Sequence, residues 1–296
     1  MSHPHIFMRF PGGLAKAVTF SFDDGSCQDI WLCGLMKEHG LKATFNLNMG
    51  LLPPSEDFDF SSLDTAIFPC KDTQHRMILS QIESTFKGSG MELATHGWTH
   101  SEYPLLDSAN IAYDILRDRC ALEKIMGEPV HGHAYAQGDF DDKTIEVLQN
   151  CGIVYGRTAW FTNDFFLPDD FMRWRPSVQY LDENVFELCD KFLSFKPGSA
   201  VYFPETRAKL LYIFAHSYEF TMHNNFDRME QVAKKVAGKS DVWYCTNIEY
   251  YNYDKAFRSL DFNLDRTVVH NPSAISVWVY ANGKTVEIPS GKTVEL

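Results

Sequence analysis

The sequence predicts an α/β fold in which helices cover a parallel sheet. Short runs of apolar, β-branched or aromatic residues alternate with longer amphipathic segments, and acidic residues or histidines end several of the runs. Repeated alternation of strand and helix is typical of a barrel or of a doubly wound parallel layer. A chain of 296 residues is within the size range of one α/β barrel with a small addition.

Eight runs predict strands because they are short, apolar and bounded by turn residues. The run LLYIFAH at 210–216 is nearly uninterrupted, which indicates a strand buried on both faces. In chain order, the predicted strands are residues 17–22, 43–48, 91–95, 131–136, 152–156, 200–203, 210–216 and 242–245.

Five segments between these runs predict helices, and several of them end in a glycine after lysine or histidine, a common helix stop. Within one of them, Ile111, Ile115, Leu122 and Ile125 keep helical spacing and predict an amphipathic helix that packs on a sheet. The predicted helical segments are residues 27–40, 75–90, 108–127, 141–152 and 225–238.

The C-terminal stretch has a different pattern. ISVWVYANGKTVEIPSGKTVEL alternates apolar and polar residues around Asn282-Gly283, which predicts a β-hairpin. We therefore expect a main domain over residues 1–262 and a small β appendage over residues 263–296, packed on the main domain. The one loop-like insertion is the segment 50–62.

Composition excludes some classes of protein. A net charge of −12 argues against general nucleic-acid binding, which needs basic patches that face phosphates. The seven scattered cysteines contain no C-x-x-C pair, so we expect reduced and mostly buried thiols. The N-terminus lacks an apolar segment of signal-peptide length, and no run reaches the about 18 apolar residues of a membrane span. These features predict a cytoplasmic protein.

Two adjacent aspartates end the first predicted strand, in TFSFDDGS. Strand alternation puts Val18, Phe20 and Phe22 on one face and directs Asp23 to the other. Sites of parallel α/β folds lie at the carboxyl ends of strands, and Gly25 permits a sharp turn that directs Asp24 to the same point. The alternative interpretation is a simple Asp-Gly turn preceded by a helix-capping aspartate.

The motif THGWTH follows another predicted strand. His96 and His100 are four residues apart, within the spacing of histidine ligands of zinc. Two histidines and one carboxylate are a ligand set of open, catalytic zinc sites. The alternative interpretation is an incidental pair of surface or capping histidines.

A third candidate is His216, which ends the predicted strand 210–216 and precedes Ser217. A histidine at the end of a core strand is often only a hydrogen-bonded structural residue. Three separate strands nevertheless end in the residue types that a metal-dependent hydrolase needs, and amide hydrolysis needs an activated water, oxyanion stabilisation and a proton for the leaving group.

Taken together, these motifs resemble the polysaccharide deacetylase family, carbohydrate esterase family 4, which shares the NodB homology domain. TFSFDDG resembles the first family motif, THGWTH the second and AHSYEF the last, and the resemblance covers roughly residues 15–250. It implies a distorted (β/α) barrel of about seven strands. It further implies that Asp24, His96 and His100 bind a metal ion, that Asp23 is the general base, and that His216 is the general acid.

The third family motif is altered, because HAYAQGD at 133–139 lacks the usual arginine. The resemblance to an A-Y-P-type variant implies that the backbone N–H of Gln137 stabilises the oxyanion and that Arg157 braces Asp23, with Arg173 and Arg175 as alternatives. His133 either approaches the metal or faces the barrel interior. The D-x-x-D-W pattern of the fourth motif is not visible, so His216 has no assigned partner. A cluster of aromatic residues either stacks on sugar rings or fills the core: Trp160, Phe161, Phe165, Phe166 and Trp174.

The expected activity is metal-dependent removal of an N-acetyl group from an amino sugar, oligosaccharide or polysaccharide. Asp/His/His ligands favour zinc, and cobalt, manganese or nickel are alternatives. The competing hypotheses are an amidohydrolase acting on a small non-sugar C–N compound and a catalytically silent carbohydrate-binding protein. The expected partner is the N-acetylated substrate, without nucleic acid or a membrane span, and the sequence leaves a homo-oligomer open.

Overall fold

The structure is a computed structural model that describes residues 5–53, 75–198 and 206–296. The predicted strand at 200–203 and residues 54–62 of the predicted insertion lie outside the described residues. Within the described part, the six cysteines are free thiols and three of them are buried. No helix in these ranges is long and apolar enough to cross a membrane.

The centre of the molecule is a parallel sheet of eight strands in the order β6-β5-β4-β3-β2-β8-β7, with β9 also paired to β2. An isolated bridge between Arg157 and Trp174 continues the β6 edge toward the segment that leads into β7. This curled sheet confirms the predicted α/β barrel-like fold class. The strands are β2 (Lys16–Asp23), β3 (Ala43–Leu47), β4 (Glu92–Thr95), β5 (Gly132–Ala134), β6 (Tyr155–Arg157), β7 (Val178–Gln179), β8 (Lys209–His216) and β9 (Val242–Tyr244).

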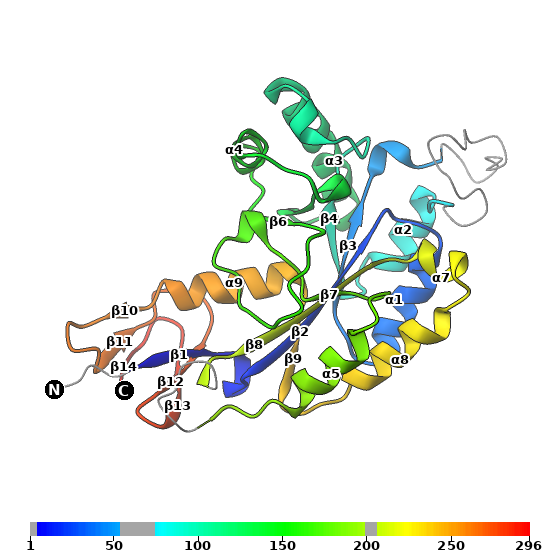
Figure 1. The fold of residues 1–296 in the computed structure, drawn as a ribbon. Coiled ribbons are helices and arrows are strands. Elements are labelled where there is room, and N and C mark those ends of the chain that lie inside the picture. The colour runs from blue at the N-terminus through cyan, green and yellow to red at the C-terminus, as the bar shows by residue number, and fades with distance from the viewer. Residues whose placement is uncertain (1–4, 54–74, 199–205) are drawn as a thin grey trace.

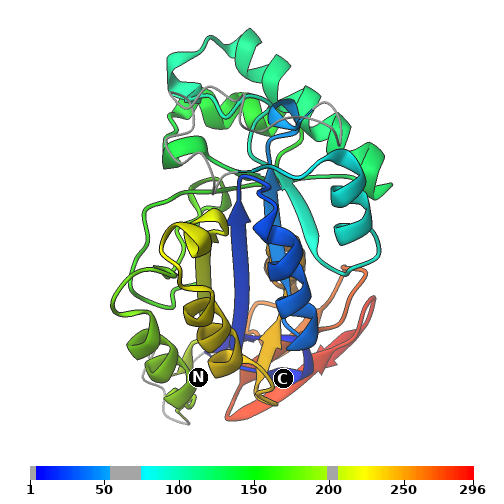
Figure 2. The ribbon, with the colours of Figure 1, turned by 90° about the vertical axis from the view of Figure 1, so that its right-hand side faces the viewer.

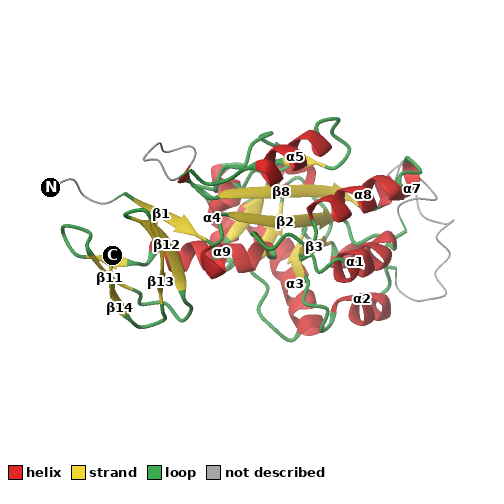
Figure 3. Ribbon diagram, turned by 90° about the horizontal axis from the view of Figure 1, so that it is seen from below, coloured by secondary structure: helices red, strands yellow, loops and turns green. Residues whose placement is uncertain are grey.

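Helices cover the outside of the sheet, where Figure 3 shows α5 and α8 beside β8 and α1 and α2 on the side of β3. All five predicted helical segments contain a helix, and α5, α7 and α9 are additional to them. The helices are α1 (Gln28–Glu38), α2 (Leu79–Phe86), α3 (Ser108–Met126), α4 (Asp142–Asn150), α5 (Val185–Ser194), α7 (Tyr218–Met222), α8 (Phe226–Val236) and α9 (Asn247–Arg258).

The two faces of β2 have different environments. Val18, Phe20 and Phe22 belong to the main hydrophobic cluster with residues of α1, α2 and α8. Ser21, on the opposite face, accepts a hydrogen bond from Asn46 of β3. The barrel interior is therefore lined with polar groups that bond one another, which fits the requirement that buried polar atoms have partners.

Two small antiparallel sheets lie at the end of the molecule where both termini are found (Figure 1). The predicted hairpin is present, since Asn282 and Gly283 have φ angles of 50° and 80° between paired strands, as a tight hairpin turn requires. N-terminal strand β1 pairs with β12. The predicted domain boundary at residue 262 stays a prediction. The strands are β1 (Ile6–Arg9), β10 (Asp261–Phe262), β11 (Val268–His270), β12 (Val277–Ala281), β13 (Lys284–Ile288) and β14 (Thr293–Glu295).

Strand β2, in blue, points away from this end of the molecule (Figure 2). Because every pairing in the large sheet is parallel, the carboxyl ends of its strands share the opposite edge. Asp23 is the last residue of β2, His96 follows β4, and His216 is the last residue of β8. The fold therefore brings the three predicted motifs to one edge.

Candidate active site

All seven predicted site residues line one cavity of about 220 Å³ at the carboxyl edge of the sheet. Their side chains come from five segments that are far apart in the sequence. The lining residues are Asp23, Asp24, His96, His100, Tyr135, Gln137, Gly138, Arg157, Ala159, Phe214, His216 and Tyr218.

Asp24, His96 and His100 are close enough to share one ion, with their candidate ligand atoms all within 4.8 Å of one another. Asp24 Oδ1 lies 4.0 Å from His96 Nε2 and 3.7 Å from His100 Nε2. The turn after β2 makes this arrangement, because Asp24 has a φ of 80° and Gly25 a φ of 68°. A Cβ at position 25 would lie 2.6 Å from Leu47 Cδ2, so both the backbone conformation and the space require glycine.

The orientation of His96 fits a metal ligand. Its Nδ1 lies 2.8 Å from the carbonyl oxygen of Ala134, so Nδ1 carries the hydrogen and the lone pair of Nε2 faces the cavity. Burial lowers the pKa of His96 to about 4, so the ring is neutral at physiological pH. A neutral imidazole held through its other nitrogen is the form that binds divalent ions. The donor set of this site therefore fits a divalent metal ion.

Two aspartates one turn apart on α3 hold the histidine loop in place. Asp118 accepts hydrogen bonds from the backbone N–H groups of Met49 at 2.7 Å and His96 at 3.2 Å. Asp114 accepts from the Trp98 N–H at 2.5 Å and from the Tyr103 hydroxyl at 3.0 Å. Asp114 and Asp118 were not predicted as site residues, although their i, i+4 spacing puts both on one face of a predicted helix.

Asp23 is buried and contacts Arg157 through both of its carboxylate oxygens. The Asn46 amide donates a further hydrogen bond to Asp23 Oδ1 at 2.8 Å. Burial alone would raise the pKa of Asp23, but Arg157 and the nearby histidines outweigh burial and hold it below its usual range. Asp23 is therefore ionised and fixed in orientation. The alternatives to Arg157 have other partners: Arg173 bonds Asp170 and Asp142, and Arg175 bonds the carbonyl groups of Trp160 and Phe161.

His216 lies between two carboxylates. Its Nε2 is 3.7 Å from Asp23 Oδ2, and its Nδ1 is 3.4 Å from Glu219 Oε1. Glu219 Oε2 also accepts the backbone N–H of His216 at 3.2 Å, and Gln179 donates to the same oxygen at 3.0 Å. Burial lowers the pKa of His216, but Glu219, Asp23 and Asp24 outweigh it and raise the value to about 9.

Glu219 is thus the partner of His216, which had no assigned partner in the sequence. The residue lies in the first turn of α7, three positions after the histidine in HSYEF. That spacing was visible in the sequence. The two side chains meet because β8 ends at His216 and α7 begins two residues later, at Tyr218.

A second arginine, Arg76, contacts Asp24. This residue was not predicted as part of the site. Its Nη2 lies 3.1 Å from Asp24 Oδ1, and its Nη1 donates to the Asp24 carbonyl group and to Asn48 Oδ1, the latter at 3.0 Å. Burial would raise the pKa of Asp24, but Arg76 and the nearby histidines outweigh it and lower the value. The adjacent aspartates therefore each have their own arginine.

The remaining predicted residues have varied surroundings. Gln137 lines the cavity with an exposed side chain and a φ of 57°. His133 is buried, bonds Thr95 at 2.8 Å and packs between two tyrosines, so it faces the interior and does not line the cavity. Among the aromatic residues, Phe165 and Trp174 are buried, whereas Trp160 and Phe166 are largely exposed.

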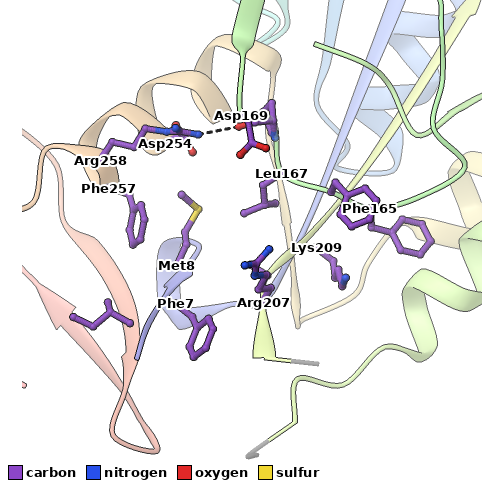
Figure 4. Close-up of a pocket in the computed structure, with 14 residues that line it drawn as sticks. Phe7, Met8, Phe165, Leu167, Asp169, Arg207, Lys209, Asp254, Phe257 and Arg258 are labelled. Carbon is purple, nitrogen blue, oxygen red and sulfur yellow. Dashed lines mark hydrogen bonds and ion pairs between the residues drawn. The ribbon is translucent and has the colours of Figure 1, made fainter. Parts of the chain in front are cut away.

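A second cavity, of about 600 Å³, lies between the end of β8 opposite His216 and strand β1 (Figure 4). It combines Phe7, Met8 and Phe257 with charged groups, among which Arg258 is paired with Asp254. None of the predicted site residues lines it. The cavity that is lined by all seven predicted site residues is therefore the better candidate for the active site.

Residues 12–156 match the family model described as polysaccharide deacetylase. No curated protein matches the chain. A candidate polysaccharide deacetylase from Mycobacterium smegmatis is similar in structure, with a TM-score of 0.55 and 15% identity over 87% of this chain and 95% of that one. At this identity the similarity shows the fold.

Two further solved structures match with lower scores. One is a deacetylase from Streptococcus pyogenes in complex with acetate, with a TM-score of 0.38 and 18% identity over 48% of this chain and 55% of that chain. The other is a CE4 family pseudoenzyme from Bacillus anthracis, with a TM-score of 0.46 and 12% identity over 82% of this chain and 67% of that chain. The match thus spans about half the length of the streptococcal protein.

Proposed function

Because residues 12–156 of this chain match the family model of the polysaccharide deacetylases, we propose that it is a metal-dependent hydrolase that removes an N-acetyl group from an amino sugar, an oligosaccharide or a polysaccharide. One observation carries the proposal: the metal-ligand set, an ionised aspartate and a paired histidine line the same cavity. These are the groups that hydrolysis of an unactivated amide needs.

Asp24, His96 and His100 would hold the metal ion. When bound there, a divalent ion supplies a Lewis acid that activates water and stabilises the developing oxyanion. The ligand types favour zinc, and they also accept cobalt, manganese or nickel.

Asp23 is proposed as the general base. The attacking water gives its proton to Asp23, whose carboxylate is ionised and held by Arg157 and Asn46. This fixed orientation matters because a general base must lie within hydrogen-bond reach of the proton it takes. Arg157 acts through Asp23 and is a positioning residue.

His216 is proposed as the general acid. Once water has added to the acetyl carbonyl carbon, the C–N bond breaks and the amine leaves with a proton from His216, giving acetate and a free amine. Glu219 and Asp23 favour the protonated imidazole that this step consumes. Gln137 lines the same cavity and is proposed to donate its backbone N–H to the oxyanion.

The cavity volume bears on the substrate. About 220 Å³ is below the roughly 300–1,000 Å³ of sites that enclose a drug-sized ligand. We therefore propose that the cavity takes the acetamido group together with part of one sugar ring, and that the rest of a longer substrate lies outside it.

Acetate release from a panel of N-acetylated sugars and oligosaccharides tests the proposal. The zinc-loaded chain is expected to release acetate from at least one of them, and the metal-stripped chain from none. Cobalt and manganese replace zinc in parallel assays. Hydrolysis of small non-sugar amides alone would overturn the sugar substrate, and sugar binding without any hydrolysis would overturn the enzymatic role.

The pH profile tests the role of His216. Because the pKa of His216 is raised to about 9 and the general acid must be protonated, kcat/KM is expected to fall only as pH rises through about 9. In Glu219→Gln this alkaline limb of the pH profile, the fall of kcat/KM at high pH, should move to lower pH. An opposite charge within about 4–6 Å changes a pKa by about one to three units, and glutamine removes the charge of Glu219, so the limb is expected to move by at least about one unit.

Glu230→Gln is the matched control for this measurement. Glu230 is a surface carboxylate paired with Lys234 on α8, and its loss should leave the pH profile unchanged. An alkaline limb that stays in place in Glu219→Gln would show that Glu219 does not set the protonation of the general acid.

A further inference from the structure

Arg76 contacts the same carboxylate oxygen that faces the two histidines. Asp24 Oδ1 lies 3.1 Å from Arg76 Nη2 and within 4.0 Å of the Nε2 atoms of His96 and His100. A carboxylate oxygen has two lone pairs, so it can accept from Arg76 and bind an ion at the same time. Any cation at this oxygen is then next to a guanidinium that is always charged.

We propose that Arg76 acts as a built-in counter-charge of the metal site, which keeps the site formed without an ion and weakens its hold on one. The inference rests on the proposed metal site at Asp24, His96 and His100. It goes beyond that assignment because it concerns the affinity of the site and the stability of the metal-free protein.

Charge compensation would stabilise the two aspartates in the absence of an ion. Asp23 and Asp24 are adjacent, their side chains are 3% and 14% exposed, and two such carboxylates repel each other when both are ionised. Arg157 neutralises Asp23, and Arg76 neutralises Asp24. Breaking either buried pair by removing the arginine would leave an uncompensated buried charge.

Arg76 compensates the charge of Asp24, but backbone hydrogen bonds hold Asp24 in position. The Asp24 N–H donates to the Asn46 carbonyl group at 3.0 Å, which fixes the start of the turn. The next residues pair with the segment that carries Arg76, since the Met77 N–H donates to the Gly25 carbonyl group at 2.9 Å and the Cys27 N–H to that of His75. These backbone bonds remain when the guanidinium is replaced.

The expected change in zinc affinity can be judged from the effect of an arginine on proton binding to an aspartate. An arginine beside an aspartate weakens proton binding by about one to three pKa units, which is about 10- to 1,000-fold. A divalent cation competes for the same oxygen and is repelled by the same charge. Replacing Arg76 by methionine is therefore expected to strengthen zinc binding by at least about tenfold.

The experiment measures the zinc Kd by competition with a chromophoric chelator, and the melting temperatures of the metal-free and zinc-loaded forms. Arg76→Met should bind zinc at least about tenfold more tightly than the parent. Its metal-free form should melt at a lower temperature, and its zinc-loaded form close to the parent. Arg76→Lys keeps the charge and should bind zinc like the parent. Weaker or unchanged zinc binding by Arg76→Met would overturn the proposal.

Arg119→Met is the matched control. Arg119 also bonds one carbonyl group, that of Cys151, and one carboxylate, that of Glu123, but it lies outside the site cavity. Its replacement should leave the zinc Kd unchanged, and an equal gain in affinity there would also overturn the proposal. All these measurements are made without substrate. A parent chain that binds zinc but releases no acetate would contradict the proposed function and leave the role of Arg76 standing.

Discussion

Replacement of Asp24 by asparagine is expected to abolish both zinc binding and deacetylase activity. Asp24 is the only carboxylate in the candidate ligand group of the described residues, and its Oδ1 faces both histidines. Asparagine keeps the shape but removes the negative charge that attracts the ion. Groups that merely orient a metal ligand change affinity about 10- to 100-fold when replaced, so loss of this ligand should weaken zinc binding by at least about 100-fold.

Zinc content after dialysis, together with acetate release, measures this outcome. His100→Ala should give the same result, because it removes another member of the ligand group. Asp261→Asn is a suitable control, since this exposed aspartate lies in β10, in one of the small sheets away from the cavity. If either Asp24→Asn or His100→Ala kept full zinc content and activity, the assignment of the metal site would be wrong.

The fold class can be predicted from the sequence mainly because of the long, buried strands. Strands β2 and β8 each pair over eight positions, and their apolar runs are recognisable without any structure. Strands β5 and β6 have three residues each and β7 has two, which is too short for a periodic pattern. Their pairing is decided by neighbours in the sheet.

Some missed elements were nevertheless predictable. Helix α9 begins with a capping box, in which Thr246 and Glu249 bond each other's backbone N–H groups, and T-x-x-E is visible in the sequence. Helix α5 buries Val185, Leu188, Cys189 and Phe192, which keep helical spacing. The pairing of β1 with β12 was not predictable, because it joins residues near opposite ends of the chain.

Some residues of the candidate site could likewise be predicted from the sequence, and others could not. Asp23, Asp24, His96, His100 and His216 could be proposed because each lies at or just after the carboxyl end of a recognisable strand. Arg76 could not, because it reaches Asp24 through the pairing of residues 75–77 with the turn after β2, and no local pattern indicates that contact. The reacting groups can therefore be predicted from the sequence more readily than the groups that neutralise and orient them.

Replacement of Asp23 by asparagine is expected to separate metal binding from turnover. Asp23 is not among the candidate ligands, so Asp23→Asn should still bind zinc. Asparagine cannot accept a proton as a base, and general base catalysis contributes about 10²–10⁴-fold, so kcat should fall by that factor. The contrast with Asp24→Asn would assign different roles to two adjacent and chemically identical residues.

Stability is the complication in this variant, and a second substitution resolves it. Asp23→Asn leaves the buried guanidinium of Arg157 without its carboxylate, and breaking a buried ion pair costs about 3–5 kcal/mol of stability. Adding Arg157→Met removes the unpaired charge and should recover much of that stability without recovering activity. Zinc content, the free energy of unfolding and kcat measured on both variants keep the two effects apart. Recovery of turnover in the double variant would show that the loss in Asp23→Asn came from instability and that Asp23 is not the base.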